Sequence, residues 1–300
     1  MPITIKQLNP LFVGEVEGVT LSSDMAAADV AAIKAGMDTF AVLVFHGQHL
    51  DDDGLLALGR TFGSIAAPRN HRVVQRLKYA ELADISNLDE KNELRRRDDH
   101  RRLDAIANML WHSDASFRPI SGELSMLHAY VVPPKGGDTE FADLRAAYDD
   151  LDAETKERID GLWVEHSIFH SRGQLGHTDY NEAERKALPS VRHPLVRVHP
   201  GSGRKTLYMG SHASHVIGWP MPEGRLLLRD LMDHATQRKY VHAHKWAVGD
   251  LVIWDNRCTL HRGRPYEDAK YPRDLRRVTT QDMASIDHNA ALLEALQAAS

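Results

Sequence analysis

Short stretches of β-forming residues, separated by turn signals, make up most of the chain between residues 108 and 280. Gly136-Gly137 and Gly249-Asp250 are two of these signals, and a strand-like stretch follows each of them. Helical periodicity occurs mainly near the start of the chain and between groups of strands. This distribution does not fit the alternating β-α-β units of a parallel sheet. It predicts a mainly β fold with decorating helices, for which a double-stranded β-helix (jelly roll) is the natural closure.

Apolar periodicity and the residues that begin or end helices give the expected elements. The sequence predicts a strand pair within 3–21, strand character over 194–216, and strands at 41–45, 108–117, 124–132, 138–142, 240–246, 250–254, 257–262 and 275–280. It predicts helices at 23–38, 51–62, 145–162 and 222–238, and a final short helix at 285–298.

Composition limits the class of protein. A chain of 300 residues suits one large domain or two small ones, and the lack of repeats and of a low-complexity linker favours a single domain over 1–300. The net charge of -5 gives no basic surface for nucleic acid. No apolar run approaches the roughly 20 residues that span a bilayer. The first residues lack the features of a signal peptide, so a cytoplasmic location is expected.

The cysteine content narrows the choice of metal. Cys258 is the only cysteine, which excludes an internal disulfide and thiolate-rich zinc sites. A metal site in this chain therefore relies mainly on His, Asp or Glu. Such ligands suit Fe(II), Mn(II) or a catalytic zinc better than a structural zinc.

His112 and Asp114 form the most informative pair in the chain. On a strand, positions i and i+2 point to the same face, so an imidazole and a carboxylate would project side by side. Two such ligands and a second His from a remote strand make the 2-His-1-carboxylate triad of non-haem Fe(II) oxygenases. His261, in the predicted strand 257–262, is the candidate for the third ligand. A His-x-Asp pair alone is a weak signal, because 18 histidines give many chance pairs. Taken alone, either His is better explained as an ordinary core residue.

Three further features join the candidate ligands. Thr139 follows a Gly-Gly turn and would place a hydroxyl inside a barrel. Arg273 and Arg277 stand four positions apart, so on a strand both guanidinium groups share a face. A guanidinium group binds a carboxylate through two hydrogen bonds. Two such groups suggest two carboxylates, one from a co-substrate and one from a substrate. Trp111 and Phe117 flank the ligands as candidate pocket walls. Each feature also has an ordinary structural explanation, and their joint occurrence in this order favours a site.

Residues 89–105 contain almost no apolar positions and cannot form a core strand. Two interpretations stay open for this segment. It is either a solvated loop, or a mobile lid over a site, because it runs directly into the segment that carries His112.

The order of these motifs resembles the taurine dioxygenase superfamily of Fe(II)/2-oxoglutarate-dependent dioxygenases. The motifs are His-x-Asp at 112–114, Gly-Gly-Asp-Thr at 136–139, Trp-Asp-Asn-Arg at 254–257, His-Arg-Gly at 261–263 and Arg-x-x-x-Arg at 273–277. Within that superfamily the chain looks most like the 2,4-dichlorophenoxyacetate dioxygenases. The strings that support this closer likeness lie at 78–87, 136–141, 145–148, 201–205, 212–215, 249–252 and 254–258. The resemblance covers about residues 8–282, and a short C-terminal extension follows.

Carried over residue by residue, the resemblance implies Fe(II) on His112, Asp114 and His261. It implies that Thr139 and Arg273 bind the distal carboxylate of 2-oxoglutarate, with O2 as the other co-substrate. The implied substrate-side residues are Arg277 for the carboxylate, Lys78 or Lys91, His199 or His215, and the apolar candidates Trp111, Phe117, Trp219 and Tyr208.

One departure from the family pattern affects the arginines. The gap from His261 to Arg273 is 12 positions (273 − 261), about one more than the family pattern leads us to expect. The extra residue falls within 269–272. If the register is shifted there, Arg276 replaces one of the two predicted arginines.

The resemblance implies hydroxylation of the carbon next to the ether oxygen of an aryloxyalkanoic acid such as 2,4-dichlorophenoxyacetate. The product would break down to a phenol and a 2-oxo acid, with succinate and CO2 from 2-oxoglutarate. Asp114 favours hydroxylation over halogenation, because a small residue there would free a metal position for halide. Alternatives are the same chemistry on an alkyl sulfonate, a sulfate ester or another small carboxylic acid, a non-catalytic metal-binding jelly roll, and a zinc hydrolase. The expected partner is a small acid, and self-association into a homo-oligomer stays open.

Overall fold

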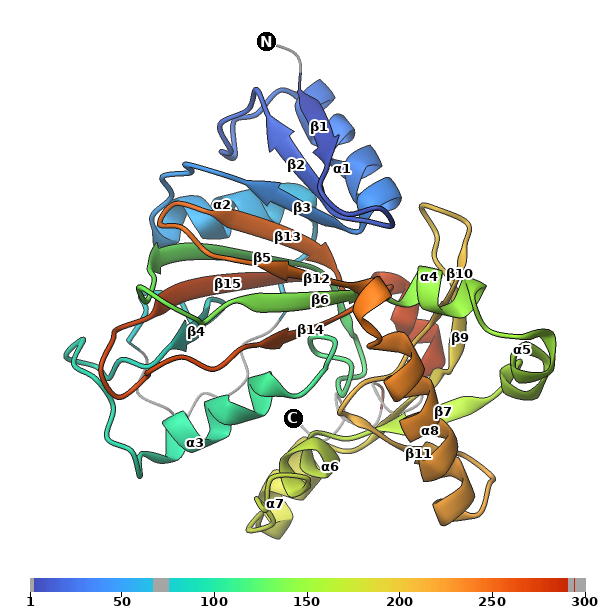
Figure 1. Ribbon diagram of the computed structural model, residues 1–300. Coiled ribbons are helices and arrows are strands. Elements are labelled where there is room, and N and C mark those ends of the chain that lie inside the picture. The colour runs from blue at the N-terminus through green and yellow to red at the C-terminus, as the bar shows by residue number, and fades with distance from the viewer. Residues whose placement is uncertain (1–2, 67–75, 291–293, 295–300) are drawn as a thin grey trace.

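The structure is a computed structural model that describes residues 3–66, 76–290 and 294. Two sheets with helices around them form one part of the molecule (Figure 1). A second group of short strands and helices adjoins them and includes the long helix α8 (Met221–Ala235).

The large sheet has seven strands, and the neighbouring strands pair antiparallel except for the parallel pair β2–β3. In spatial order the strands are β1 (Thr4–Gln7), β2 (Gly14–Glu17), β3 (Val42–Phe45), β13 (Leu251–Asp255), β5 (Gly122–Val131), β15 (Asp274–Gln281) and β4 (Ala83–Ser86).

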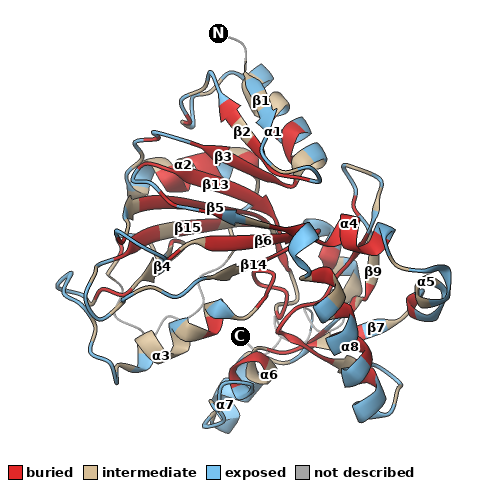
Figure 2. Cartoon of the chain, viewed as in Figure 1, coloured by how far each residue is buried: buried red, intermediate tan, exposed pale blue. Residues whose placement is uncertain are grey.

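Both faces of the large sheet are buried near its centre, which explains why strands β3 and β13 are almost wholly apolar. Alternate residues of β13 point to opposite faces. Ile253 packs under the helices α1 (Ala27–Phe40) and α2 (Asp52–Phe62), whereas Trp254 packs on the other face, against Phe141. Figure 2 shows these central strands as buried.

A three-stranded sheet supplies the second layer. Its order is β12 (Val241–His244), β6 (Thr139–Asp143) and β14 (Thr259–Gly263), all antiparallel. Phe141 of β6 lies in the apolar layer between the two sheets. Two sheets of this kind are the components that a jelly roll requires. The predicted sheet-rich fold with decorating helices is therefore confirmed.

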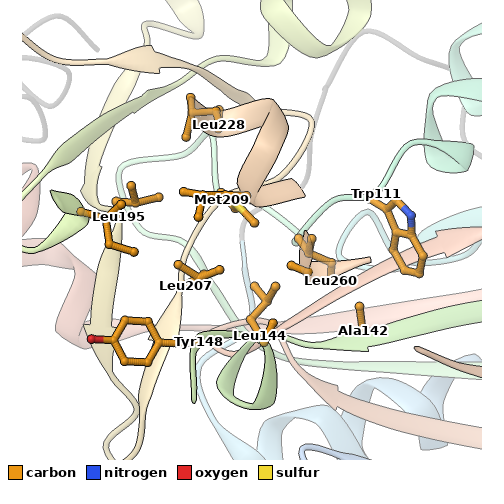
Figure 3. Packing of buried hydrophobic residues seen from close by; sticks show 14 of the residues in the cluster. Trp111, Ala142, Leu144, Tyr148, Leu195, Leu207, Met209, Leu228 and Leu260 are labelled. Carbon is orange, nitrogen blue, oxygen red and sulfur yellow. The ribbon is translucent and has the colours of Figure 1, made fainter. Parts of the chain in front are cut away.

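Many of the remaining elements pack around a third core cluster, shown in Figure 3. Leu144, Leu207 and Leu260 meet there from a helix and two strands. The elements of this part are α4 (Leu144–Asp149), α5 (Ala153–Ile159), β7 (Trp163–His166), α6 (Ile168–Gly173), α7 (Glu182–Ala187), β8 (Val191–Pro194), β9 (Val196–Val198), β10 (Lys205–Leu207), β11 (Ala213–Val216), α8 and the 3-10 turns η2 (Arg238–Tyr240) and η3 (Met283–His288).

Most predicted elements are present within a few residues of their expected bounds, but the predicted strand 108–117 is wrong. The segment begins with a 3-10 turn, η1 (Ala107–Met109), makes a single β-bridge at His112, and then turns. Ala115 adopts a left-handed conformation with φ of 56°. The β-forming residues that suggested a strand are core residues: Trp111 and Phe117 are both buried.

Two helix predictions also need correction. The predicted helix 145–162 is two helices, because Asp152 caps the start of α5 by accepting a hydrogen bond from the Thr155 N–H. The predicted helix 285–298 is the 3-10 turn η3 as far as residue 288, and most of its remainder lies outside the described residues.

The charged segment 89–105 is neither a plain loop nor a core strand. Its first half consists of turns, and its second half begins helix α3 (His100–Ile106), which Asp99 caps. Strands β4 and β7 and helices α6 and α7 have no counterpart in the predicted elements. Among the described residues, no helix is long and apolar enough to cross a membrane.

His166 is a fully buried histidine at the end of β7, stacked on Tyr208 with ring centroids 5.5 Å apart. Burial, with a smaller effect of the nearby Arg197, lowers the pKa of His166 to about 3. The ring is therefore neutral in the folded protein, whereas in the unfolded chain it takes up a proton below about pH 6.5. Its contribution to stability is present above pH 6.5 and is lost as the pH falls toward 3.

We expect the His166→Phe variant to lose less stability than the wild type between pH 7 and pH 5. The difference in slope should approach one proton, about 1.4 kcal/mol per pH unit. Urea unfolding at a series of pH values measures this slope. Equal slopes in the two proteins would show that His166 does not titrate differently on unfolding.

Candidate metal centre

The structure brings His112, Asp114 and His261 together, and all three are buried. Their ligand atoms lie within 4.8 Å of one another. Asp114 Oδ1 lies 3.9 Å from His112 Nε2, and Asp114 Oδ2 lies 3.6 Å from His261 Nε2. Two imidazoles and a carboxylate are the donor set that binds Fe(II) or Mn(II) on one face. The residues present therefore fit the predicted metal.

The two histidines are placed by backbone pairing across the edge of the small sheet. His112 and His261 form a β-bridge in which each backbone N–H donates to the other carbonyl, at 3.0 and 2.9 Å. The Nδ1 atom of His112 lies 2.8 Å from the carbonyl oxygen of Leu110. That contact makes Nδ1 the protonated nitrogen and Nε2 the metal-ligand nitrogen.

Asp114 reaches the same point from a turn rather than from a strand. Its backbone N–H donates to Asn256 Oδ1 at 3.0 Å, and the Gly122 N–H donates to its carbonyl. A side chain at Gly122 would place its Cβ only 2.8 Å from that carbonyl oxygen. The approach of β5 to the ligand turn therefore requires glycine.

The triad faces a cleft that also contains the other predicted binding residues. Its walls come from the two sheets, from α3 and η1, and from the loop that precedes β15. The lining residues are Asp84, Ile85, Ser86, Asn87, Arg102, Ala105, Ile106, Asn108, Met109, His112, Leu127, Thr139, Trp254, His261, Gly263, Arg264, Tyr266, Asp268, Arg273 and Arg277.

Arg273 is a buried cation whose guanidinium hydrogen bonds go to backbone carbonyls. Its guanidinium group donates to the carbonyl oxygens of Ile85 and Gly137, each at 3.3 Å, and among the described residues no carboxylate lies within ion-pair distance of it. Burial lowers the pKa of Arg273, since the charged form is desolvated. A buried charge of this kind is stabilised by an anion, and the adjoining cleft has room for an anionic ligand.

Thr139 offers a hydroxyl proton to the same cleft. The indole N–H of Trp246 lies 3.0 Å from Thr139 Oγ1, and an indole can only donate. Thr139 Oγ1 is therefore the acceptor in this contact, and its own proton is available for a carboxylate.

Arg277 lies beside the metal centre. Its Nη1 atom is 2.6 Å from Asp114 Oδ1, and the side chain is 7 % exposed. Arg276 points to the opposite face of β15, where it forms ion pairs with Asp52 and Asp274. Of these three arginines, Arg273 and Arg277 line the cleft, together with Arg102 and Arg264, and Arg276 does not.

The structure does not bring the other predicted substrate-side residues to this cleft. Trp111 packs in the core cluster labelled in Figure 3, with the guanidinium of Arg262 4.4 Å from its ring. Lys78 pairs with Asp53 at the surface, and Lys91 is exposed. His199 is hydrogen-bonded to Asp255, and His215 lies in a separate hollow beside Glu165. The residues that line the cleft also do not include Phe117, Tyr208 or Trp219.

Asn87 is a functional residue that sequence analysis did not single out. Its side-chain oxygen accepts the backbone N–H of Arg273 at 2.8 Å. Its side-chain nitrogen donates to the carbonyls of Asp268 and Tyr271 at 2.7 and 2.9 Å. Asn87 therefore holds the loop that contains the extra residue and fixes the start of β15. It lies in the string 78–87, but the sequence does not show that its side-chain amide bonds to residues far along the chain.

Comparisons with known proteins agree with this geometry. Residues 4–279 match the family described as "Taurine catabolism dioxygenase TauD, TfdA family". The alpha-ketoglutarate-dependent 2,4-dichlorophenoxyacetate dioxygenase of Burkholderia sp. (strain RASC) is 50 % identical over 282 residues, covering 93 % of this chain and 95 % of that protein. An (S)-phenoxypropionate/alpha-ketoglutarate-dioxygenase of Delftia acidovorans is 37 % identical, covering 86 % and 88 %.

A solved structure is similar over nearly the whole chain. It is the crystal structure of AAD-2 in complex with Mn(II) and N-oxalylglycine, with a TM-score of 0.87 and 45 % identity. The match covers 94 % of this chain and 98 % of that one. This chain belongs to the TauD, TfdA family of dioxygenases.

Removing any triad side chain should abolish tight Mn(II) binding. The His112→Ala, Asp114→Ala and His261→Ala variants each lose one ligand, so affinity should fall by more than the about 100-fold that loss of an outer-shell partner costs. Calorimetric titration of the full chain with Mn(II) measures this. The His49→Ala variant, which changes an exposed histidine, is the matched control. Wild-type affinity in any of the three variants would contradict the assignment.

Proposed function

We propose that this chain is an Fe(II)- and 2-oxoglutarate-dependent dioxygenase that cleaves aryloxyalkanoic acids such as 2,4-dichlorophenoxyacetate. It hydroxylates the carbon next to the ether oxygen. One oxygen atom of O2 enters that carbon, and the other enters succinate as 2-oxoglutarate loses CO2. The hydroxylated product is a hemiacetal, which breaks down to a phenol and a 2-oxo acid. The curated relatives named for 2,4-dichlorophenoxyacetate and phenoxypropionate support this substrate class.

The observation that carries the proposal is the pair of buried guanidinium groups in the cleft of the triad. Arg273 and Arg277 are 8 % and 6 % exposed, and both line that cleft. Two positive charges at one metal centre match two acids, 2-oxoglutarate and the substrate. A metal-binding protein without turnover, or a zinc hydrolase, needs no second acid site.

The co-substrate side is formed by Thr139 and Arg273. Arg273 donates two N–H groups to the distal carboxylate of 2-oxoglutarate, and Thr139 adds its hydroxyl proton. The Gly137 carbonyl holds the guanidinium in place at 3.3 Å. A similar structure that contains Mn(II) and N-oxalylglycine supports this assignment.

The substrate side is formed by Arg277 and an apolar wall. Arg277 holds the substrate carboxylate beside the metal, so that the adjacent C–H group faces the reacting oxygen. Ile85, Ile106, Met109 and Leu127 line the same cleft and offer apolar surface to an aryl ring.

The metal, held by His112, Asp114 and His261, supplies the activation of O2. The protein's part is to bind the two acids in order and to keep water out. Residues 89–105 act as a lid in a single domain spanning 1–300. Arg102 of α3 forms two hydrogen bonds to Asp268, at 2.9 and 3.1 Å, across the cleft. The proposal also includes a cytoplasmic location, supported by the lone Cys258, and a small acid as partner.

The reaction itself gives the direct test. The purified full chain, given 2,4-dichlorophenoxyacetate, Fe(II), 2-oxoglutarate and O2, should release phenol and succinate in equal amounts. Omission of Fe(II) or 2-oxoglutarate should stop both. Succinate without phenol would favour another acid, such as an alkyl sulfonate or a sulfate ester, over an aryloxyalkanoate. Neither product, from chain that binds Fe(II), would contradict the proposed function.

The two arginines should have separate kinetic effects. Loss of a buried charge that pairs with a ligand costs about 2 kcal/mol or more, or about 30-fold in affinity. We expect Arg277→Ala to raise the KM for the aryloxy acid by about this factor, and Arg273→Ala to raise the KM for 2-oxoglutarate.

The Arg276→Ala variant is the control, because Arg276 lies on the same strand but outside the cleft. It should leave both KM values unchanged, although loss of its ion pairs reduces stability. Interchanged effects of the two cleft arginines would show that the assignment of the two acids is reversed.

A further inference from the structure

Behind the metal centre, the Asp114 carboxylate rests on a small network of buried polar side chains. Ser125 of β5 and Asn256, just after β13, are both fully buried. Thr279 of β15 completes the network. None of the three is among the residues that line the cleft.

The hydrogen bonds form a closed ring around one side of Asp114. Ser125 Oγ lies 2.7 Å from Asp114 Oδ2. Asn256 Nδ2 donates to Ser125 Oγ at 2.9 Å, and Asn256 Oδ1 accepts the backbone N–H of Asp114 at 3.0 Å. A single amide thus holds both the backbone of the ligand residue and the hydroxyl that contacts its carboxylate.

The donors and acceptors in this ring can be assigned without ambiguity. An ionised carboxylate only accepts, so Ser125 donates its one proton to Asp114. Ser125 Oγ then accepts from Asn256 and from Thr279 Oγ1, which lies 2.9 Å away. Thr279 is therefore a donor, and each hydrogen-bonding position of the Ser125 hydroxyl is used.

The orientation of the Asn256 amide is fixed in the same way. Its oxygen faces two groups that only donate, the Asp114 N–H and the Trp254 indole N–H at 3.0 Å. Its nitrogen faces Ser125 Oγ and the carbonyl oxygen of Glu123 at 3.3 Å. A reversed amide would oppose donor to donor at both positions, so only one orientation satisfies the buried groups.

We propose that Ser125 and Asn256 are positioning residues that fix the orientation of the Asp114 carboxylate for metal binding. The inference rests on the proposed metal site and extends it to residues outside the cleft. A ligand held in one orientation before the metal arrives loses less freedom on binding, and outer hydrogen bonds of this kind typically change metal affinity by about 10–100-fold.

Thr279 serves as an internal comparison. It donates to Ser125 and does not contact Asp114 in the described network. Without Thr279, Ser125 keeps both its proton donation to Asp114 and its bond from Asn256. The network therefore predicts that loss of the Ser125 hydroxyl weakens metal binding, whereas loss of the Thr279 hydroxyl does not.

The test is the Kd for Mn(II) of the full chain, measured by titration of the free ion by electron paramagnetic resonance. The Ser125→Ala variant should bind Mn(II) about 10–100-fold more weakly than the wild type. The Ser125→Thr variant keeps the hydroxyl but alters packing, and it should retain the wild-type Kd. Thr279→Val should also retain it.

A matched control separates metal positioning from general stability. Ser171 is likewise fully buried, and its hydroxyl donates to a backbone carbonyl at 2.9 Å. The Ser171→Ala variant loses a buried hydroxyl far along the chain from the triad, so its Kd for Mn(II) should be unchanged even if thermal unfolding shifts.

A second variant provides an independent route if Ser125→Ala does not fold. Asn256→Asp has nearly the same shape, but its carboxylate accepts the Ser125 proton in competition with Asp114. It should weaken Mn(II) binding as Ser125→Ala does. An unchanged Kd in either folded variant would overturn the inference. Failure of the wild type itself to bind Mn(II) would instead contradict the metal site and the proposed function.

Discussion

The buried carboxylate of Asp114 is the interaction on which the site depends. It lies within 3.9 Å of both ligand histidines, and it also contacts Arg277 and Ser125. A carboxylate that is 1 % exposed is costly unless charges and donors surround it. The residues that stabilise this charge come from β14, β15 and β5. The arrangement of these strands in the fold is therefore also what assembles the metal centre.

Charge is also what would distinguish the two acids of the proposed function. Arg273 has no carboxylate partner among the described residues, whereas Arg277 lies 2.6 Å from Asp114 Oδ1. The first guanidinium is available for the distal carboxylate of a co-substrate, held away from the metal. The second is next to the metal ligand, so an acid bound there lies beside the reacting oxygen.

The sequence was informative where local pattern and chemistry coincide. The triad, Thr139 and the two arginines follow from residue types and their order, and strands β3 and β13 follow from apolar runs. The predicted strand 108–117 failed because Asn256, far along the chain, holds Asp114 in a turn. Ser125 and Asn256 were not foreseen as partners, since 131 positions separate them. Local periodicity predicts elements, but it does not show which distant polar side chains meet in the interior.

The most direct test of this account is a crystal structure of the full chain with Mn(II) and N-oxalylglycine bound. The account predicts the metal on His112, Asp114 and His261, and the distal carboxylate of N-oxalylglycine on Thr139 and Arg273. It also predicts that Arg277 contacts no part of N-oxalylglycine and faces the space for substrate. A distal carboxylate on Arg277, or a metal bound away from Asp114, would contradict the central claim that this cleft holds two acids at one metal.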